Sequence, residues 1–335
     1  MDKTEKKLSF KDLLFTGIGL TIGAGVVSTV GPAVGVTGRS AWLAYFVAIL
    51  VGALTCIPAM IFSATFRVRG GNYTCIRNAL GENIGGIYIC TNILMGLNFA
   101  TFAIASGAYI NGLVPALNPR LVASVVLVAF WLLNMRGLNV FVKVQSVMSY
   151  VLLSALLIFG IYGLFHLDSA VFEFSNPEFF LNGSSGFITA TTMFMFSTVA
   201  YGVLLNFSGS AENPKRDIPR AMLGTIITII VVYEVVAITA SGVLPVEKVA
   251  GQTLTVIAEA MWPKTVAVIF VIAGPLMALF TTLNGNFANM AAPQLAAARD
   301  GWWPKVMAKT NRWGSPYVVY TICFLIAFIP ILLDY

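Results

Sequence analysis

The sequence predicts an all-α protein that crosses a membrane several times, and three observations support this prediction. Of the 335 residues, 58% are hydrophobic and 10% are charged, whereas soluble domains average about 45–50% and 25%. The apolar residues are gathered in runs of about 20, the length that a helix needs to span a bilayer. Short polar connections separate these runs. The composition therefore excludes a soluble enzyme.

Charge and cysteine content narrow the possible partners. The net charge is +6, but the basic residues lie between apolar runs, where they orient a membrane protein; no nucleic acid partner is expected. Neither a CxxC pair nor a metal-binding spacing occurs among Cys56, Cys75, Cys90 and Cys323. His166 alone cannot form a histidine-based metal site. We therefore expect no metal site, no disulfide framework and no cleavable signal peptide.

Apolar runs bounded by charge, Pro or Gly predict nine spans within a single integral membrane domain. The predicted spans are residues 12–34, 41–66, 84–114, 121–135, 144–165, 186–209, 219–244, 265–290 and 316–333. An N-terminal segment, residues 1–11, precedes them. The segment ending at Asp334 and Tyr335 follows the ninth span directly, so we expect the chain to be cut short, either as a truncated reading frame or as a fragment.

The basic residues alternate between the two sides of the membrane. Sixteen of the 20 fall on one side, and four, Arg39, Arg120, Lys248 and Lys264, fall on the other. Because Lys and Arg are enriched in cytoplasmic loops, this bias predicts a cytoplasmic N-terminus in a multi-pass protein of the cell membrane.

The first span contains four glycines within ten residues, Gly17, Gly19, Gly23 and Gly25. Each glycine costs a helix interior up to about 1 kcal/mol relative to alanine, so the helix is expected to be weak near Gly23. The alternative is close helix packing through small residues, which is common in membrane bundles.

The sixth span is also interrupted, because small and polar residues gather at mid-depth between Phe196 and Gly202. Two interrupted spans five apart indicate an inverted-repeat transporter with its site at the midplane. Residues 12–165 would form the first repeat and residues 186–333 an incomplete second one. Free backbone N–H groups at such breaks can hold a carboxylate, and free carbonyls can hold an ammonium group. This chemistry suits a zwitterion.

Glu234 is an ionisable residue inside the seventh span, which makes it a candidate for function, for example as a proton carrier. The alternative is a protonated or snorkelling glutamate that faces a water-filled cavity. The residues around it in sequence do not separate the two interpretations.

Five groups of residues carry a family resemblance along the whole chain. They are Gly17–Gly25, Arg69–Tyr73 with Ala79–Gly81, Asn134–Gly137 with Val142–Gln145, Asn213–Arg220, and Ala298–Gly301 with Pro304. In this order they resemble the amino acid permeases of the amino acid, polyamine and organocation (APC) superfamily. The resemblance implies a leucine-transporter-like bundle of five plus five inverted helices, usually within twelve spans, with discontinuous helices 1 and 6. It implies a secondary transporter of amino acids with no cofactor beyond a coupling proton or sodium ion.

The resemblance also implies which residues bind substrate. The first-helix break falls on Thr21, Ile22, Gly23, Ala24 and Gly25, with amides from Ala24 onward facing a substrate carboxylate. The sixth-helix break runs from Phe196, at the position of an aromatic gate, through Ser197, Val199 and Ala200 to Tyr201. Asn98 in the third span either faces the substrate or bridges helices.

The chain departs from the family pattern at three places. Ala200 stands where the family often has glycine, and Gly202 stands where many members have glutamate. A lysine found in the fifth helix of some members has no counterpart, because Leu152 and Ser154 occupy that neighbourhood.

Thr281 and Thr282 lie near where related sodium-coupled carriers place hydroxyl ligands, and hydroxyl oxygens suit a hard cation. The interpretation that we favour is that these hydroxyls hydrogen-bond to their own helix or to a neighbour. Further along the chain, Arg299 and Asp300 are a candidate gate pair.

A neutral amino acid is the first candidate substrate, because the first, third and sixth spans have no acidic residue at mid-depth. The alternative is a cationic amino acid or a polyamine, for which Glu234 is the candidate counter-charge. A channel or sensor with the same fold is a further alternative. The oligomeric state is not predicted.

Overall fold

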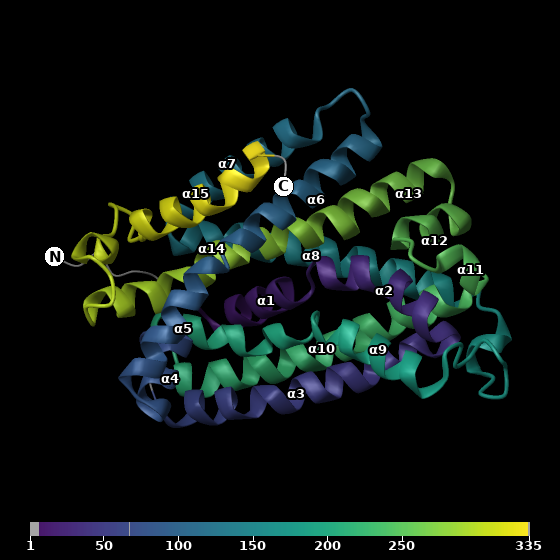
Figure 1. Ribbon diagram of the computed structural model, residues 1–335, viewed down its shortest axis with the longest axis horizontal. Coiled ribbons are helices and arrows are strands. Elements are labelled where there is room, and N and C mark those ends of the chain that lie inside the picture. Colours follow the sequence, from purple (N-terminus) through teal and green to yellow (C-terminus); the bar gives the residue numbers. More distant parts are fainter. Residues whose placement is uncertain (1–6, 67, 334–335) are drawn as a thin grey trace.

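The computed structural model describes residues 7–66 and 68–333, which form an all-helical bundle. Most helices run along the long axis of the molecule and lie side by side (Figure 1). Within the described ranges, the one β-type pairing is an isolated bridge between Leu8 and Ala211. Lys3, Lys6, Arg67, Asp334 and Tyr335, which entered the predictions of orientation and chain end, lie outside the described residues.

The long helices overlap all nine predicted spans. In chain order they are α1 (Phe10–Thr21) with α2 (Ala24–Thr37), α3 (Ala41–Thr65), α5 (Glu82–Leu94) with α6 (Leu97–Leu113), α7 (Pro119–Asn134), α8 (Leu138–Leu164), α9 (Gly183–Met195) with the 3₁₀ helix η3 (Val199–Ser210), α10 (Pro214–Gly242), α13 (Lys264–Val271) with the π-helical turn η4 (Ile272–Leu276) and α14 (Met277–Arg299), and α15 (Tyr317–Leu333). Six stretches of the described chain are long and apolar enough to cross a membrane, and α7 and α15 are shorter apolar helices.

Short helices at the two ends of the bundle were not predicted. The helix α4 (Gly71–Leu80) lies at one end, whereas α11 (Val246–Val249) and α12 (Leu254–Met261) lie at the other (Figure 1). The remaining short elements are the 3₁₀ turns η1 (Gly38–Ser40), η2 (Ser169–Phe172) and η5 (Lys305–Ala308). We refer to the two ends as the α4 end and the α12 end.

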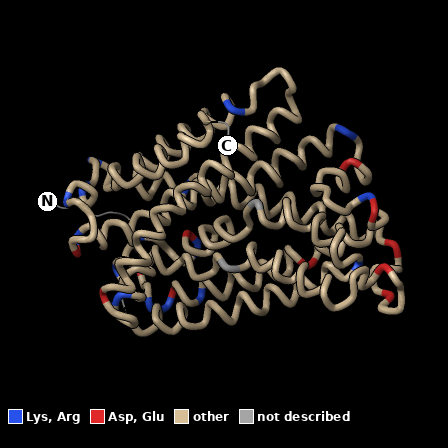
Figure 2. The backbone as a smooth tube through the Cα atoms, viewed as in Figure 1, with Lys and Arg blue, Asp and Glu red and all other residues tan. Residues whose placement is uncertain are grey.

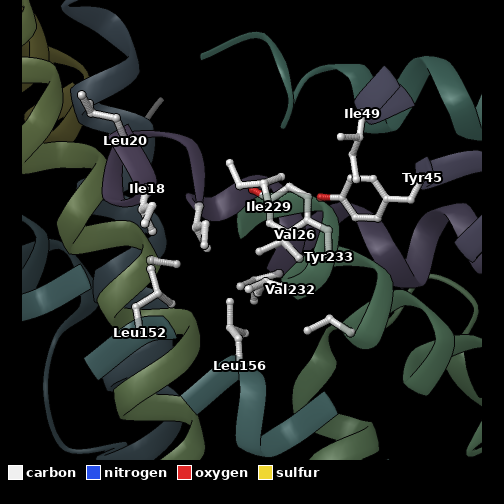
Figure 3. Close-up of a cluster of buried hydrophobic side chains, with 14 of the residues drawn as sticks. Ile18, Leu20, Val26, Tyr45, Ile49, Leu152, Leu156, Ile229, Val232 and Tyr233 are labelled. Carbon is white, nitrogen blue, oxygen red and sulfur yellow. The ribbon is translucent and has the colours of Figure 1, made fainter. Parts of the chain in front are cut away.

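The interior of the bundle is formed around the broken first span. Figure 1 shows α1 and α2 between α8 and α14 on one side and α3, α9 and α10 on the other. Side chains from α1, α2, α3, α8 and α10 pack there into one buried apolar cluster, which includes Ile18, Val26, Leu152 and Val232 (Figure 3). A second cluster joins α6, α7, α14 and α15. Because lipid is as apolar as these side chains, such packing depends mainly on close van der Waals contact.

The outer surface and the two ends have opposite character. Large apolar side chains face outward along the helices, for example Leu54 (64% exposed) and Ile158 (62% exposed), as a lipid-facing surface requires. Figure 2 shows that Lys and Arg gather toward the α4 end, whereas most of the charges at the α12 end are carboxylates. An exception at the α12 end is Arg39, which is 5% exposed and pairs with Asp168 and Glu178.

Candidate functional site

The first break separates α1 from α2 at Ile22 and Gly23, as the glycine-rich sequence predicts. The Ile22 amide still donates to the Ile18 carbonyl at 2.7 Å, and the Gly23 amide donates to the Thr21 carbonyl at 2.8 Å. Gly23 then takes an extended conformation (φ −111°, ψ −160°) and precedes the first turn of α2. Because glycine has no side chain that could cap the helix, the first amides of α2 are left for another acceptor.

The second break is a change of helix type. α9 ends at Met195, a turn covers residues 196–198, and η3 continues as a 3₁₀ helix for 12 residues. Runs of 3₁₀ helix beyond three or four residues are uncommon and often mark a functional hinge. The discontinuity predicted between Phe196 and Tyr201 is therefore present. The backbone there winds into the tighter 3₁₀ helix and does not become extended.

The two breaks lie against each other. A Cβ atom added to Gly25 would lie 2.5 Å from the Cβ of Ser197, closer than any real contact. On the other face of the second break, a Cβ atom added to Gly52 of α3 would lie 2.6 Å from the Thr198 hydroxyl oxygen. Glycine at both positions lets the second break fit between α2 and α3.

A cavity of ≈240 Å³, which we name the central cavity, opens beside these breaks. Its lining comes from α2, α6, the turn after α9, η4 and α14: Val27, Ser28, Asn98, Thr101, Phe102, Ala105, Tyr109, Phe196, Pro275 and Leu279. No Asp, Glu, Lys or Arg is among these described residues. The volume is somewhat below the ~300–1,000 Å³ of pockets for drug-sized ligands.

Two larger cavities lie toward the ends of the bundle, each with a volume of about 390 Å³. The cavity at the α12 end is lined by α6, α12 and α13 and shares Tyr109 with the central cavity. Its lining includes one carboxylate, Glu259. The cavity at the α4 end is lined by Arg69, Arg77 and Asp300, among others. The central cavity shares none of its described lining residues with the cavity at the α4 end.

Asp300 connects two elements at the α4 end. Its carboxylate accepts a hydrogen bond from the Tyr73 hydroxyl at 2.9 Å and pairs with Arg77. Burial, together with the hydrogen bond to Asp300, raises the pKa of Tyr73 to about 12. The expected pairing of Asp300 with Arg299 is wrong, because α4 folds over the end of α14 and brings Arg77 to the carboxylate instead.

The predicted residues of the first break are buried. Thr21, Ile22 and Gly23 are in the core, and the Thr21 carbonyl accepts a hydrogen bond from the Tyr233 hydroxyl at 2.8 Å. Gly25 faces Ser197, as described above. The side chain of Ala24 lies outside the described part of the structure.

The predicted residues of the second break are spread over different surroundings. Phe196 is 67% exposed and lines the central cavity together with Asn98. Ser197 is buried and hydrogen-bonds to Tyr45. Tyr201 is 1% exposed, and its hydroxyl has no hydrogen-bond partner within the described residues. Ala200 is half-buried; the side chain of Val199 is not described.

The candidate ion-coupling residues lie apart from the central cavity. The hydroxyls of Thr281 and Thr282 donate to the Ala278 carbonyl at 3.0 and 2.8 Å. These are hydrogen bonds to their own helix, as the favoured interpretation predicts. Thr282 also contacts Gly23 of the first break. Glu234 is half-buried on α10, and one of its carboxylate oxygens is buried without a hydrogen bond inside the described ranges.

Several lining residues were not predicted from the sequence, namely Val27, Ser28, Thr101, Phe102, Ala105, Tyr109, Pro275 and Leu279. Only Pro275 carried a usable signal. A proline inside an apolar span removes a backbone hydrogen bond, and here it lies in the π-helical turn η4, a feature that often marks functional sites. The others look like ordinary apolar or small polar residues in their spans.

Comparison with known proteins gives consistent similarities. The sequence pattern of a family described as amino acid permease matches residues 8–334. An uncharacterized protein of Methanocaldococcus jannaschii is 25% identical over 91% of this chain and 71% of its own length. Cationic amino acid transporter 9, chloroplastic, of Arabidopsis thaliana is 24% identical over 92% of this chain and 58% of its own length. The branched-chain amino acid permease BcaP of Bacillus subtilis is 22% identical over 94% of this chain and 72% of its own length.

Among solved structures, a Na⁺-coupled sialic acid symporter in a substrate-bound, outward-open state superposes with a TM-score of 0.71. The match covers 98% of this chain and 74% of that chain at 10% identity. At this identity the similarity shows the fold alone, and it is the leucine-transporter fold that the resemblance implied.

Proposed function

Since this chain belongs to the amino acid permease family, whose members are transporters and not enzymes, we propose that it moves a neutral amino acid across the cell membrane by alternating access. The N-terminus and the α4 end would then face the cytoplasm, as the concentration of Lys and Arg there favours (Figure 2). The relatives differ in the substrates that their names give, so the choice of substrate depends on this chain's own residues.

The two helix breaks supply the groups that a zwitterion needs. The uncapped first turn of α2 offers backbone N–H groups and the positive end of a helix dipole to the substrate carboxylate. Near the second break, carbonyls that have lost regular α-helical partners can accept from the ammonium group. No charged side chain is required for either contact.

The composition of the central cavity is the observation that carries the proposal. Its described lining holds no ionisable acid or base apart from Tyr109, and apolar side chains dominate it. A cationic side chain desolvated there would lack a counter-charge, which costs several kcal/mol. An apolar side chain would instead be favoured by burial against Phe102, Phe196 and Leu279.

Thermal unfolding of the purified protein in detergent tests this proposal. A ligand at one hundred times its Kd, bound to the folded state alone, stabilises that state by ~2.7 kcal/mol. We expect stabilisation by one or more apolar neutral amino acids and none by lysine, arginine, glutamate or polyamines. Stabilisation by a cationic compound alone would reject the neutral substrate, and no stabilisation by any amino acid would reject the proposed function.

A cationic amino acid or a polyamine is the second candidate, and Glu234 is the observation that favours it. Glu234 follows Tyr233 on α10, and one of its carboxylate oxygens has no hydrogen-bond partner among the described residues. The Tyr233 hydroxyl contacts the first break. If the bundle rearranges during transport, this carboxylate inside the seventh span is the candidate counter-charge. Loss of cationic uptake on Glu234→Gln, with retained folding, would favour this candidate.

The coupling ion is tested in the same experiment. A hydroxyl that donates a hydrogen bond keeps lone pairs for a cation, and Thr282 lies against Gly23. Substrate stabilisation that requires Na⁺ and disappears in Thr282→Val would support a sodium site at this contact. Equal stabilisation in Na⁺ and in choline would leave a proton or a counter-substrate as the driving species.

A further inference from the structure

Two buried tyrosines connect the two helix breaks. Tyr45 comes from α3 and Tyr233 from α10, and both side chains are fully buried. Their ring centroids are 4.8 Å apart, and Figure 3 shows both side chains within the buried apolar cluster of α1, α2, α3, α8 and α10. Neither residue belongs to a broken helix or lines the central cavity.

Each hydroxyl is hydrogen-bonded to a different break, and the two rings pack against each other. The Tyr45 hydroxyl lies 2.8 Å from the Ser197 hydroxyl in the second break. The two rings contact each other, with their centroids 4.8 Å apart. The Tyr233 hydroxyl donates to the Thr21 carbonyl in the first break at 2.8 Å. We name Ser197, Tyr45, Tyr233 and Thr21 the tyrosine link.

The protons of the tyrosine link can be assigned without conflict. A hydroxyl has one proton to donate and can accept at the same time. Tyr233 uses its proton on the Thr21 carbonyl and Ser197 uses its proton on the Phe194 carbonyl at 2.7 Å, so Tyr45 can donate to Ser197. Each donor is used once. The Phe194 carbonyl lies within the last turn of α9.

Packing alone does not explain tyrosine at these positions. A buried hydroxyl is costly unless it is hydrogen-bonded, and phenylalanine would fill the same space with no polar atom to satisfy. The Tyr45 ring is already held by stacking on Phe194 at a centroid distance of 3.9 Å. The hydroxyls therefore have a separate role, and the groups that they contact lie in the two breaks.

The helices that carry the two tyrosines are suited to this role. Each is a single uninterrupted α-helix, of 25 residues for α3 and 29 for α10, and the two lie side by side (Figure 1). By contrast, α2 and η3 each begin at a break without a side-chain cap. A pair of uninterrupted helices can thus fix the position of two segments that have no side-chain cap of their own.

We propose that Tyr45 and Tyr233 are positioning residues whose hydroxyls hold the first and second helix breaks in one relative geometry and thereby set the affinity for substrate. The part that concerns affinity rests on the proposed function, since it requires that substrate bind at the breaks. The part that concerns the geometry of the breaks does not.

The test compares Tyr45→Phe, Tyr233→Phe and the double variant with wild type. Tyr320→Phe is the matched control, because Tyr320 is also buried but lies on α15 in the second apolar cluster. Hydrogen–deuterium exchange is measured for the amides of residues 21–25 and 196–201 and for the rest of the chain. Each single variant should speed exchange in both break segments and leave exchange in the other helices unchanged. The control variant should speed exchange in neither break segment.

Affinity gives the second measurement. With the amino acid that stabilises the wild type, each single variant should raise Kd roughly five- to tenfold, about the effect of one net hydrogen bond. KM for uptake should rise by the same factor. The double variant should lie close to the singles, because either change interrupts the same link. Additive effects in the double variant would show two independent contacts and overturn the proposal.

The outcomes separate this proposal from the proposed function. Unchanged exchange in both break segments overturns the positioning role, whatever the transport result. Faster exchange confined to those segments supports the role even if the wild type binds no amino acid, in which case the proposed function fails alone. If neither tyrosine variant folds, Ser197→Ala interrupts the link without altering the aromatic core and must show the same local exchange.

Discussion

Gly25 and Ser197 are 172 positions apart in the sequence, yet they pack against each other: a Cβ atom added to Gly25 would lie 2.5 Å from the Cβ of Ser197. This contact joins the first turn of α2 to the turn that follows α9. It explains in physical terms why a glycine stands at this point of the first span. It also fixes how closely the two helix breaks approach each other.

Gly25→Ala is expected to abolish substrate stabilisation, because the added methyl group must push the two breaks apart. The matched control is Gly202→Ala, where an added Cβ would meet Ala59 at an ordinary 3.8 Å. Thermal unfolding with and without the neutral amino acid identified for the wild type measures both. Gly25→Ala combined with Ser197→Gly should recover part of the effect, because the opposing Cβ is removed. Full binding by Gly25→Ala alone would contradict the contact.

Glu234→Gln is expected to leave the Kd for a neutral amino acid within about twofold of wild type, because Glu234 does not line the central cavity. Equilibrium binding measures this, with Glu259→Gln at the α12 end as a matched change in an exposed carboxylate. A loss of binding in Glu234→Gln alone would place the carboxylate in the substrate site and contradict this expectation.

Arg39→Met is expected to lower the free energy of unfolding by about 1–2 kcal/mol. The guanidinium is buried and bonds Asp168, Glu178 and the Ser241 carbonyl, so its removal leaves that carbonyl without a donor. The effect is moderate because the two carboxylates are partly exposed and can be hydrated. Chemical unfolding measures it, with Lys264→Met as the exposed control at the same end.

Tyr73 is expected to stabilise the α4 end up to alkaline pH. Because its folded-state pKa of about 12 lies above the ordinary value of 10.0, the stabilisation is fully present below pH 10 and is lost as the pH rises through 12. The difference in unfolding free energy between wild type and Tyr73→Phe should stay constant from pH 6 to 9. It should shrink above pH 10. A difference that already falls between pH 6 and 9 would show that another group titrates there.

The span positions and the first break could be predicted because they depend on local sequence. Long apolar runs specify membrane helices, and Gly23 next to Gly25 weakens a helix wherever it is placed. The second break was predicted in position, but its 3₁₀ form depends on contacts of Ser197 and Thr198 with α2 and α3. These contacts are made by residues far apart in the chain.

The central cavity could be predicted only in part, for a related reason. Asn98 and Phe196 carry a polar or family signal, whereas Tyr109, Phe102 and Leu279 have the character of ordinary span residues and become lining residues through the packing of α6 against α14. Tyr45 and Tyr233 were missed because nothing in their own spans distinguishes them. Their importance comes from the two breaks that they contact.

Counterflow into proteoliposomes is the measurement that tests the central claim most directly. Vesicles containing the purified chain are loaded with an unlabelled apolar neutral amino acid, and entry of the same labelled amino acid is followed. We predict saturable entry that is faster with internal substrate than without it and is not competed by lysine or arginine. Entry that is linear with concentration and unaffected by internal substrate would contradict alternating access, and competition by lysine or arginine would contradict a neutral substrate.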